Sequence, residues 1–205
     1  MKKFILTITT ALIGLSLSAQ NIISDFTGTL NGHCSSFEYQ YSMSGSVPMS
    51  GNGSVKLQGD SFVMKGDGLE IFCDGKTRWT NDVVAEECYI EKVDGGSLDF
   101  EANPALLVAA VDKAFTLKKT SSATFNGKKV TEASLAPVKK KGNIGDVSLF
   151  LSADLKPVGA TLKLGDGSTI TITIRNFTLG DQLPTKEFTL DTKKLDKSYI
   201  ITDLR

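Results

Sequence analysis

The sequence lacks the charge surplus and the cysteine content that mark several classes of protein. Its 23 Lys and Arg residues balance 23 Asp and Glu residues, whereas nucleic-acid binding needs a clustered basic surplus. Three cysteines in 205 residues are too few for a disulfide scaffold. An apolar content of 40% excludes a disordered chain and predicts one globular domain.

The sequence is also poor in groups that carry catalysis or bind metals. Its single histidine, His33, lies beside Cys34 in a Gly- and Ser-rich approach to a predicted strand. Neighbouring side chains on a strand point to opposite faces, which argues against a His33–Cys34 catalytic pair. The sequence contains no HExxH, CxxC or clustered acid motif. We therefore expect no enzyme activity, no catalytic residues, no metal site and no cofactor.

The N-terminus has the pattern of a secretory signal peptide. A positively charged start at residues 1–3 precedes a mostly apolar stretch at 4–17, and small residues follow up to Ala19. No later stretch approaches eighteen apolar residues, the length of a membrane-spanning helix. Since no cysteine directly follows the apolar stretch, a lipid anchor is not expected. The pattern predicts cleavage near Ala19 and a single periplasmic domain over residues 20–205.

Most of the remaining chain alternates between apolar and polar residues. The clearest run, 37–43, places Phe37, Tyr39, Tyr41 and Met43 on one face, because side chains alternate along a strand. The Asp-Gly pair at 74–75 is a hairpin signal. These patterns predict an antiparallel meander. The predicted strands cover 37–43, 54–57, 61–65, 69–73, 76–80, 85–93, 128–136, 147–152, 158–164, 168–178 and 187–190.

One segment, 103–115, has the features of a helix. Asn103 is a capping residue, a proline follows it, and the segment is rich in alanine. Leu107 and Val111 share an apolar stripe that Leu106 widens. A second, weaker helix is predicted at 20–26. Roughly ten strands with one or two helices predict a mainly β fold, a strongly curved sheet or half-open antiparallel β-barrel closed by a helical lid.

The order and spacing of several landmarks resemble the outer-membrane lipoprotein carrier family (LolA-like), as a divergent member. The landmarks are Gly53 at the start of a strand, the strand–turn–Trp unit at 71–79, the 103–107 segment, the 166–174 strand and Phe188. Two features depart from the family. Its basic residue before a proline, which helps to fasten the lid, is replaced by the sequence Gln-Gly-Asp at 58–60. The long N-terminal helix is shortened to the stretch around 22–26.

The resemblance implies a carrier without a cofactor, whose apolar cavity shelters the acyl chains of lipoproteins. We expect the protein to be a monomer. Such carriers cross the periplasm from an inner-membrane release complex to an outer-membrane acceptor. Two alternatives use the same fold. One is a protein that binds free lipid or another hydrophobic ligand, and the other is a sensor or structural domain whose core is filled by its own side chains.

An acyl-binding cavity needs a wide apolar lining, because each buried methylene contributes roughly 0.8 kcal/mol. The alternative is that the same residues form a packed core, which is the commonest position of apolar side chains. The predicted lining residues are Phe37, Tyr39, Tyr41, Met43, Phe62, Met64, Leu69, Ile71 and Trp79 on the strands, with Leu106, Leu107 and Val111 on the helix.

The three cysteines raise the question of a disulfide. In an oxidising compartment two of Cys34, Cys73 and Cys88 are expected to pair, leaving one odd thiol. In a meander, Cys73 and Cys88 lie on strands that a third strand separates, so Cys34 is the preferred partner in any disulfide.

Overall fold

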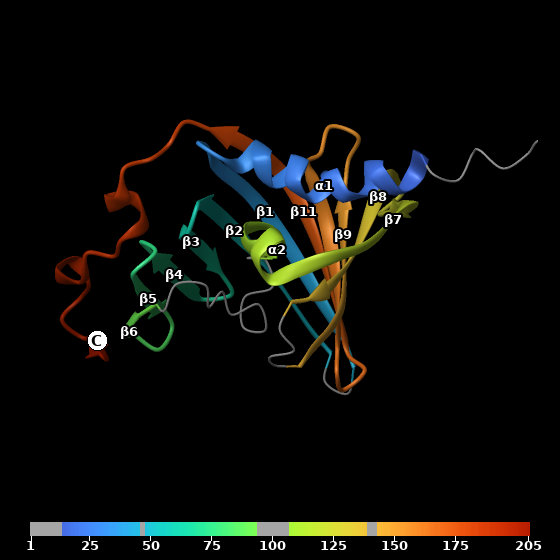
Figure 1. The fold of residues 1–205 in the computed structure, drawn as a ribbon. Helices are drawn as coiled ribbons and strands as arrows, with labels where there is room; N and C mark the ends of the chain where they lie inside the picture. Colours follow the sequence, from blue (N-terminus) through green and yellow to red (C-terminus); the bar gives the residue numbers. More distant parts are fainter. Residues whose placement is uncertain (1–13, 46–47, 94–106, 139–142) are drawn as a thin grey trace, which may run out of the picture.

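The computed structural model describes residues 14–45, 48–93, 107–138 and 143–205, which form twelve strands and two α-helices (Figure 1). The helices are α1 Gly14–Leu30 and α2 Leu107–Ala114. The strands are β1 Cys34–Ser44, β2 Met49–Gln58, β3 Ser61–Gly66, β4 Leu69–Cys73, β5 Thr77–Asp82, β6 Glu87–Lys92, β7 Phe115–Phe125, β8 Lys128–Pro137, β9 Ile144–Leu151, β10 Pro157–Leu164, β11 Thr169–Gly180 and β12 Ile200–Asp203.

All twelve of these strands belong to one curved, open sheet in the order β12-β6-β5-β4-β3-β2-β1-β11-β10-β9-β8-β7. Neighbouring strands are antiparallel, except that β12 runs parallel to β6. The sheet is continuous through β1, which pairs with both β2 and β11 and so joins the two halves of the chain. The predicted mainly β fold, a strongly curved sheet with helices, is confirmed.

Local sequence explains the hairpins of the first half. At the turn between β4 and β5, the Asp74 carboxylate accepts hydrogen bonds from the backbone N–H groups of Lys76 (2.9 Å) and Thr77 (2.7 Å). Gly75 has a φ of +87°, a conformation that glycine adopts without steric cost. The predicted hairpin therefore forms where the Asp-Gly pair stands.

Two strands of the structure have no predicted counterpart, and one predicted strand does not form. β7 was not predicted, because its middle is polar and mostly exposed and shows no period of two. β12 was not predicted either, since its four residues are too few for a pattern. The predicted strand 187–190 is wrong: Thr185–Phe188 is a 3₁₀ turn, in which the backbone N–H of Glu187 donates to the carbonyl of Pro184.

Both helices lie on the concave side of the sheet (Figure 1). α1 extends beyond the predicted 20–26 at both ends. Near its C-terminal end the Thr27 and Thr29 hydroxyls donate to carbonyls one turn back, and Gly32, with a φ of +78°, follows the helix. In the predicted helix 103–115, residues 103–106 lie outside the described residues, and Phe115 begins β7. Neither described helix is long and apolar enough to cross a membrane.

After β11 the chain passes to the convex side of β3–β6 (Figure 1). There Phe188 packs with Cys34 and Val63. Further along, beyond a second 3₁₀ turn at Thr192–Lys194, Tyr199 joins a cluster around Trp79. The sheet therefore has apolar side chains on both faces, with helices covering one and the C-terminal segment covering part of the other.

The expected disulfide is absent. Cys34, Cys73 and Cys88 are all free and buried. Cys73 belongs to the concave core, whereas Cys34 and Cys88 belong to separate clusters on the convex face. Four strands lie between β1 and β6, so Cys34 and Cys88 are roughly 20 Å or more apart at ordinary strand spacing, well beyond the reach of a disulfide.

Candidate ligand-binding site

The strand register brings predicted lining residues into one row on the concave face. Phe37 lies opposite Val55, Val55 opposite Met64, and Met64 opposite Ile71. All four side chains are buried in one apolar cluster. The row crosses four neighbouring strands, so residues that are distant in sequence form a continuous apolar surface.

A second row extends this surface towards the β2–β3 turn. Phe62 pairs with Leu57 on one side and with Cys73 on the other, and all three are buried in the same cluster. Phe62 is therefore placed beside Met64 and Ile71, as the alternation predicted.

The Tyr39 side chain lies over two paired glycines, Gly53 of β2 and Gly66 of β3. A Cβ atom on Gly53 would lie 2.6 Å from the Tyr39 hydroxyl, and one on Gly66 would lie 2.9 Å from it. The Tyr39 ring stacks on Tyr41 with 6.4 Å between centroids. Burial, followed by the nearby Asp67 carboxylate, raises the pKa of Tyr39 to about 12 and raises that of Tyr41. Both hydroxyls are therefore uncharged at neutral pH.

The outer end of this surface is only partly covered. Tyr41 and Met43 are half-buried and pack against the edge of the cluster. Leu69 is on the same face of β4 as Ile71, two residues away, but its side chain is 36% exposed beside the β3–β4 turn. Leu69 is therefore not in the buried cluster.

Trp79 does not line the concave face, and this part of the prediction is wrong. It pairs with Phe72 and Ile90, whereas Ile71 pairs with Thr80. Four residues separate the paired Cys73 and Arg78, so odd-numbered residues of β4 pair with even-numbered residues of β5. Paired residues have their side chains on the same side of the sheet, so Trp79 and Ile71 point to opposite sides. Trp79 consequently packs on the convex side under the C-terminal segment.

Side chains from both helices cover the concave face. Leu107 and Val111 of α2 are fully buried in the concave cluster, together with Phe26 of α1. Leu106 lies outside the described residues. Phe26 and Ile23 were missing from the predicted lining, although their spacing of three was visible in the weak helix at 20–26. In the described part of the chain, helix side chains thus pack directly on the surface that a ligand would need.

One ion pair connects the helical cover to the sheet. Lys113 of α2 lies 2.9 Å from Asp60 in the β2–β3 turn, and the hydrogen bond to that carboxylate raises the pKa of the Lys113 ammonium. Among the ion pairs of the described residues, this one alone joins a helix to the sheet. The helices also contact the sheet through apolar packing and through a backbone hydrogen bond from the Val138 N–H, just after β8, to the Ala114 carbonyl at the end of α2 (2.9 Å).

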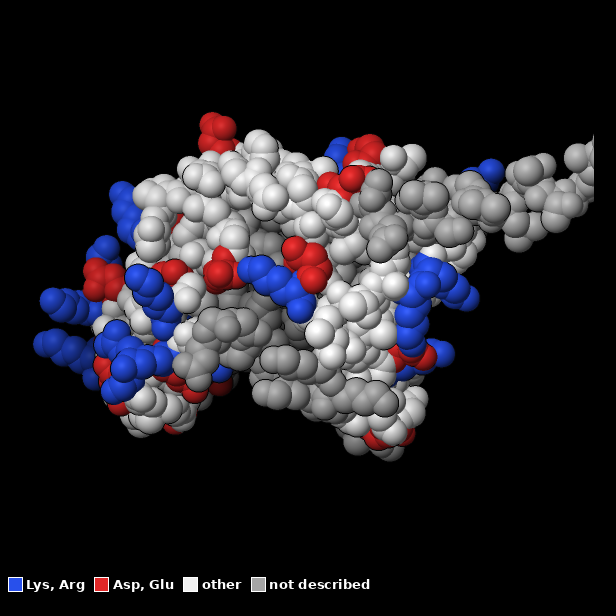
Figure 2. All heavy atoms as spheres, in the orientation of Figure 1, with Lys and Arg blue, Asp and Glu red and all other residues white. Residues whose placement is uncertain are grey.

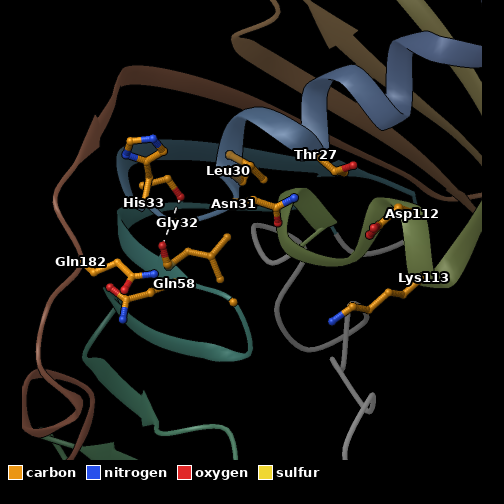
Figure 3. A pocket seen from close by; sticks show the side chains of 12 residues that line it. Thr27, Leu30, Asn31, Gly32, His33, Gln58, Asp112, Lys113 and Gln182 are labelled. Carbon is orange, nitrogen blue, oxygen red and sulfur yellow. Dashed lines mark hydrogen bonds between the residues drawn. The ribbon is translucent and has the colours of Figure 1, made fainter.

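A cavity of about 300 Å³ opens beside this ion pair. It lies between the C-terminal end of α1, the β2–β3 turn, α2 and the chain that follows β11 (Figure 3). Asn31, Gln58, Lys113 and Gln182 are among its lining residues. Sequence reasoning did not find this pocket, because its residues come from four separate segments and form no motif.

The groups associated with catalysis and metal binding are dispersed. His33 is exposed, with its Nδ1 3.4 Å from the Gly180 carbonyl oxygen, whereas Cys34 is buried. Burial raises the pKa of the Cys34 thiol, which disfavours a nucleophilic thiolate. Within the described ranges, no three His, Cys, Asp or Glu side chains are grouped so as to hold a metal ion.

Fold and site together define a class of β-rich proteins in which helices cover the apolar concave face of a strongly curved sheet. This chain belongs to the outer membrane lipoprotein carrier protein LolA family, whose sequence model matches residues 44–191. A search of the curated proteins found no match.

Two solved structures support the assignment of the fold. An uncharacterized conserved protein from Thermus thermophilus is 11% identical, with a TM-score of 0.55 over 88% of this chain and 96% of that protein. A LolA superfamily protein from Nitrosomonas europaea is 12% identical, with a TM-score of 0.50 over 84% of this chain and 98% of that protein. At these identities the likeness concerns the fold alone.

Proposed function

We propose that this protein is a non-enzymatic periplasmic carrier that shelters the acyl chains of lipoproteins on its concave face during their transfer to the outer membrane. Membership of the LolA family and the signal-peptide pattern of residues 1–19 support this role. The observation that carries it is the position of Phe26, Leu107 and Val111, which occupy the concave apolar surface as an acyl chain would.

The burial energies of the helix side chains and of an acyl chain are comparable. Burying one large apolar side chain contributes about 1.5–3 kcal/mol, so these three helix residues contribute roughly 5–9 kcal/mol. A single acyl chain with about fourteen methylenes contributes roughly 11 kcal/mol at about 0.8 kcal/mol each. Because apolar contacts are not directional, acyl chains can replace the helices on the same surface.

A second candidate function is favoured by the completeness of the packing. Since Phe26 and Val111 are fully buried, the concave cluster has the character of a finished core. A sensor or structural domain with a filled core would have the same side chains in the same places. The two functions differ in one respect: only in a carrier does a ligand displace the helix side chains from the concave surface.

Native mass spectrometry of the protein, purified from periplasmic extract, separates these functions. The probe is a synthetic peptide whose N-terminal cysteine carries a diacylglyceryl group, and the control is the same peptide without acyl chains. A carrier of lipoproteins forms a one-to-one complex with the acylated peptide only. Binding of phosphatidylglycerol but not of the acylated peptide would indicate a free-lipid carrier. Binding of neither would indicate a filled core.

A further inference from the structure

The polar pocket beside the Lys113–Asp60 ion pair has an apolar inner side that is continuous with the concave core. Leu57 lines the pocket and is also a buried member of the concave cluster. Leu30, at the end of α1, lines the pocket as well and packs against the same cluster. A chain that enters between α1 and α2 thus meets polar groups first and apolar side chains next.

Two amide side chains of the pocket are available for hydrogen bonding. Within the part of the chain that the structure describes, Asn31 and Gln182 form hydrogen bonds through neither their amide N–H groups nor their amide oxygens. In Figure 3 the Asn31 amide points towards α2, and Gln182 lies beside Gln58. An amide both donates and accepts hydrogen bonds, so each of these two side chains can pair with esters, amides or hydroxyls.

The backbone around both amides is held in place. Gln58 donates to the Leu183 carbonyl (3.0 Å) and accepts from the Leu183 N–H (2.7 Å), which anchors the residue next to Gln182. Asn31 follows directly after α1, where its N–H donates to the Gly28 carbonyl (3.3 Å). The backbone at both residues is therefore fixed before a ligand binds, and only the exposed amide side chains must be ordered on binding.

The charges of the pocket favour an uncharged ligand group. Its lining carries one cation, Lys113, and one anion, Asp112. The Lys113 ammonium is already paired with Asp60. Figure 2 shows the same mixture, with acidic side chains beside basic ones over α2. An ionised carboxylate or phosphate would meet the Asp112 carboxylate and an ammonium group that Asp60 already neutralises.

We propose that this pocket binds the uncharged ester and amide groups at the head of an acylated ligand, whose acyl chains continue past Leu57 onto the concave face. This inference depends on the proposed function. A volume of about 300 Å³ lies at the lower end of the range for small-molecule sites and suits a glyceryl group with its ester linkages. Asn31 and Gln182 supply the hydrogen bonds, and Leu30 and Leu57 contact the first methylenes.

The test compares three probes on the full protein and on the double variant Asn31→Leu with Gln182→Met. The probes are the diacylglyceryl-cysteine peptide, dipalmitoylglycerol and N-phenyl-1-naphthylamine, an apolar dye without ester or amide groups. Because each lost hydrogen bond weakens binding by about three- to tenfold, the double variant should bind the acylated peptide at least about tenfold more weakly. Its affinity for the dye should not change. Gln40→Met is the matched control, since Gln40 is exposed on the opposite face of β1.

The outcomes separate the pocket from the proposed function. Weaker binding of both the peptide and dipalmitoylglycerol supports recognition of glyceryl esters, and weaker binding of the peptide alone supports recognition of its amide. Unchanged binding of every probe by the double variant overturns the pocket and leaves the carrier function standing. If the unaltered protein binds no acylated probe at all, the proposed function fails, and this inference fails with it.

Discussion

The ammonium nitrogen of Lys113 lies 2.9 Å from a carboxylate oxygen of Asp60, and this contact joins α2 to the turn between β2 and β3. In the carrier family a basic residue on the strand that begins near Gly53 helps to fasten the lid, and in this sequence Gln-Gly-Asp at 58–60 replaces it. Here the acid is on the turn and the cation is on the helix. Both side chains are more than half exposed, at 61% and 69%, so the pair contributes at most about 1 kcal/mol.

Removing this ion pair should speed ligand entry more than it lowers stability. We expect Asp60→Asn to increase the association rate of N-phenyl-1-naphthylamine, measured by stopped-flow fluorescence. The free energy of unfolding should fall by less than about 1 kcal/mol. Since salt screens exposed charges, the unaltered protein should approach the rate of the variant at a salt concentration of about 1 M.

Asp146→Asn is the matched control for this variant. It breaks an exposed ion pair of the same type, between Lys118 and Asp146 at 2.6 Å, but this pair joins β7 to β9 and leaves α2 untouched. Equal association rates for Asp60→Asn, Asp146→Asn and the unaltered protein would mean that the Lys113–Asp60 pair does not restrain the helix.

Shortening a buried helix side chain should lower stability and strengthen ligand binding together. Leu107 is 1% exposed within the concave cluster, so Leu107→Ala should cost about 2–5 kcal/mol of unfolding free energy. Because the helix then competes less strongly for the apolar surface, the acylated peptide should bind more tightly. Calorimetric titration measures the affinity, and thermal unfolding measures the stability.

Leu204→Ala provides the comparison, because Leu204 is 61% exposed and should change neither quantity by much. A Leu107→Ala protein that is destabilised but binds no better would indicate that α2 is part of a permanent core.

A methyl group on Gly53 should be far more disruptive than one on Gly28. At Gly53 the new Cβ would collide with the Lys65 carbonyl oxygen and lie 2.6 Å from the Tyr39 hydroxyl, so Gly53→Ala should cost about 1–3 kcal/mol. At Gly28, within α1, a Cβ atom meets nothing within 4 Å. Gly28→Ala should therefore raise stability by up to about 1 kcal/mol, the helix preference of alanine over glycine. Urea unfolding of both variants measures these differences, and equal effects would contradict the placement of Tyr39.

The three thiols should be protected in the native protein and should lower its stability at alkaline pH. Burial raises the pKa of Cys34, Cys73 and Cys88 from an ordinary value of 9.0. Above that pH the thiols ionise in the unfolded chain before they ionise in the native protein, so ionisation stabilises the unfolded state. Native stability should consequently fall as the pH rises through about 9 towards the native pKa values.

Labelling with iodoacetamide at a pH of about 8, just below the ordinary thiol pKa, provides the direct measurement of this protection. We expect little reaction in buffer, modification of all three thiols in concentrated guanidinium chloride, and no change of melting temperature on adding a reducing agent. Rapid native labelling would show that the thiols are accessible, and a lower melting temperature after reduction would reveal a disulfide.

Some elements were predictable because their information is local. The alternation from Phe37 to Met43 determines both a strand and the face on which its aromatic residues lie, since side chains alternate along any strand. The Asp-Gly pair at 74–75 determines a turn by its own hydrogen bonds. The apolar stripe of Leu107 and Val111 likewise indicated a buried helix face.

Other elements depend on partners that a sequence does not reveal. The sequence predicts the wrong side of the sheet for Trp79. The number of residues in the turn before β5 decides whether its odd-numbered or its even-numbered side chains lie on the same side as Ile71. β7 is polar over most of its length and is a strand only because β8 pairs with it. The 187–190 segment has strand-like residues, but no described strand is paired with it, and Phe188 instead packs as part of a 3₁₀ turn.

The sequence by itself determined a mainly β domain with a buried apolar helix and an N-terminal export pattern, because periodicity and composition express preferences that each segment carries alone. Only the tertiary structure decided which helix residues cover the concave face, that Lys113 meets Asp60, and that Asn31 and Gln182 border one pocket. These relationships join segments that are far apart in the sequence. They arise from the curvature of the sheet and the register of its strands, which are collective properties of the whole chain.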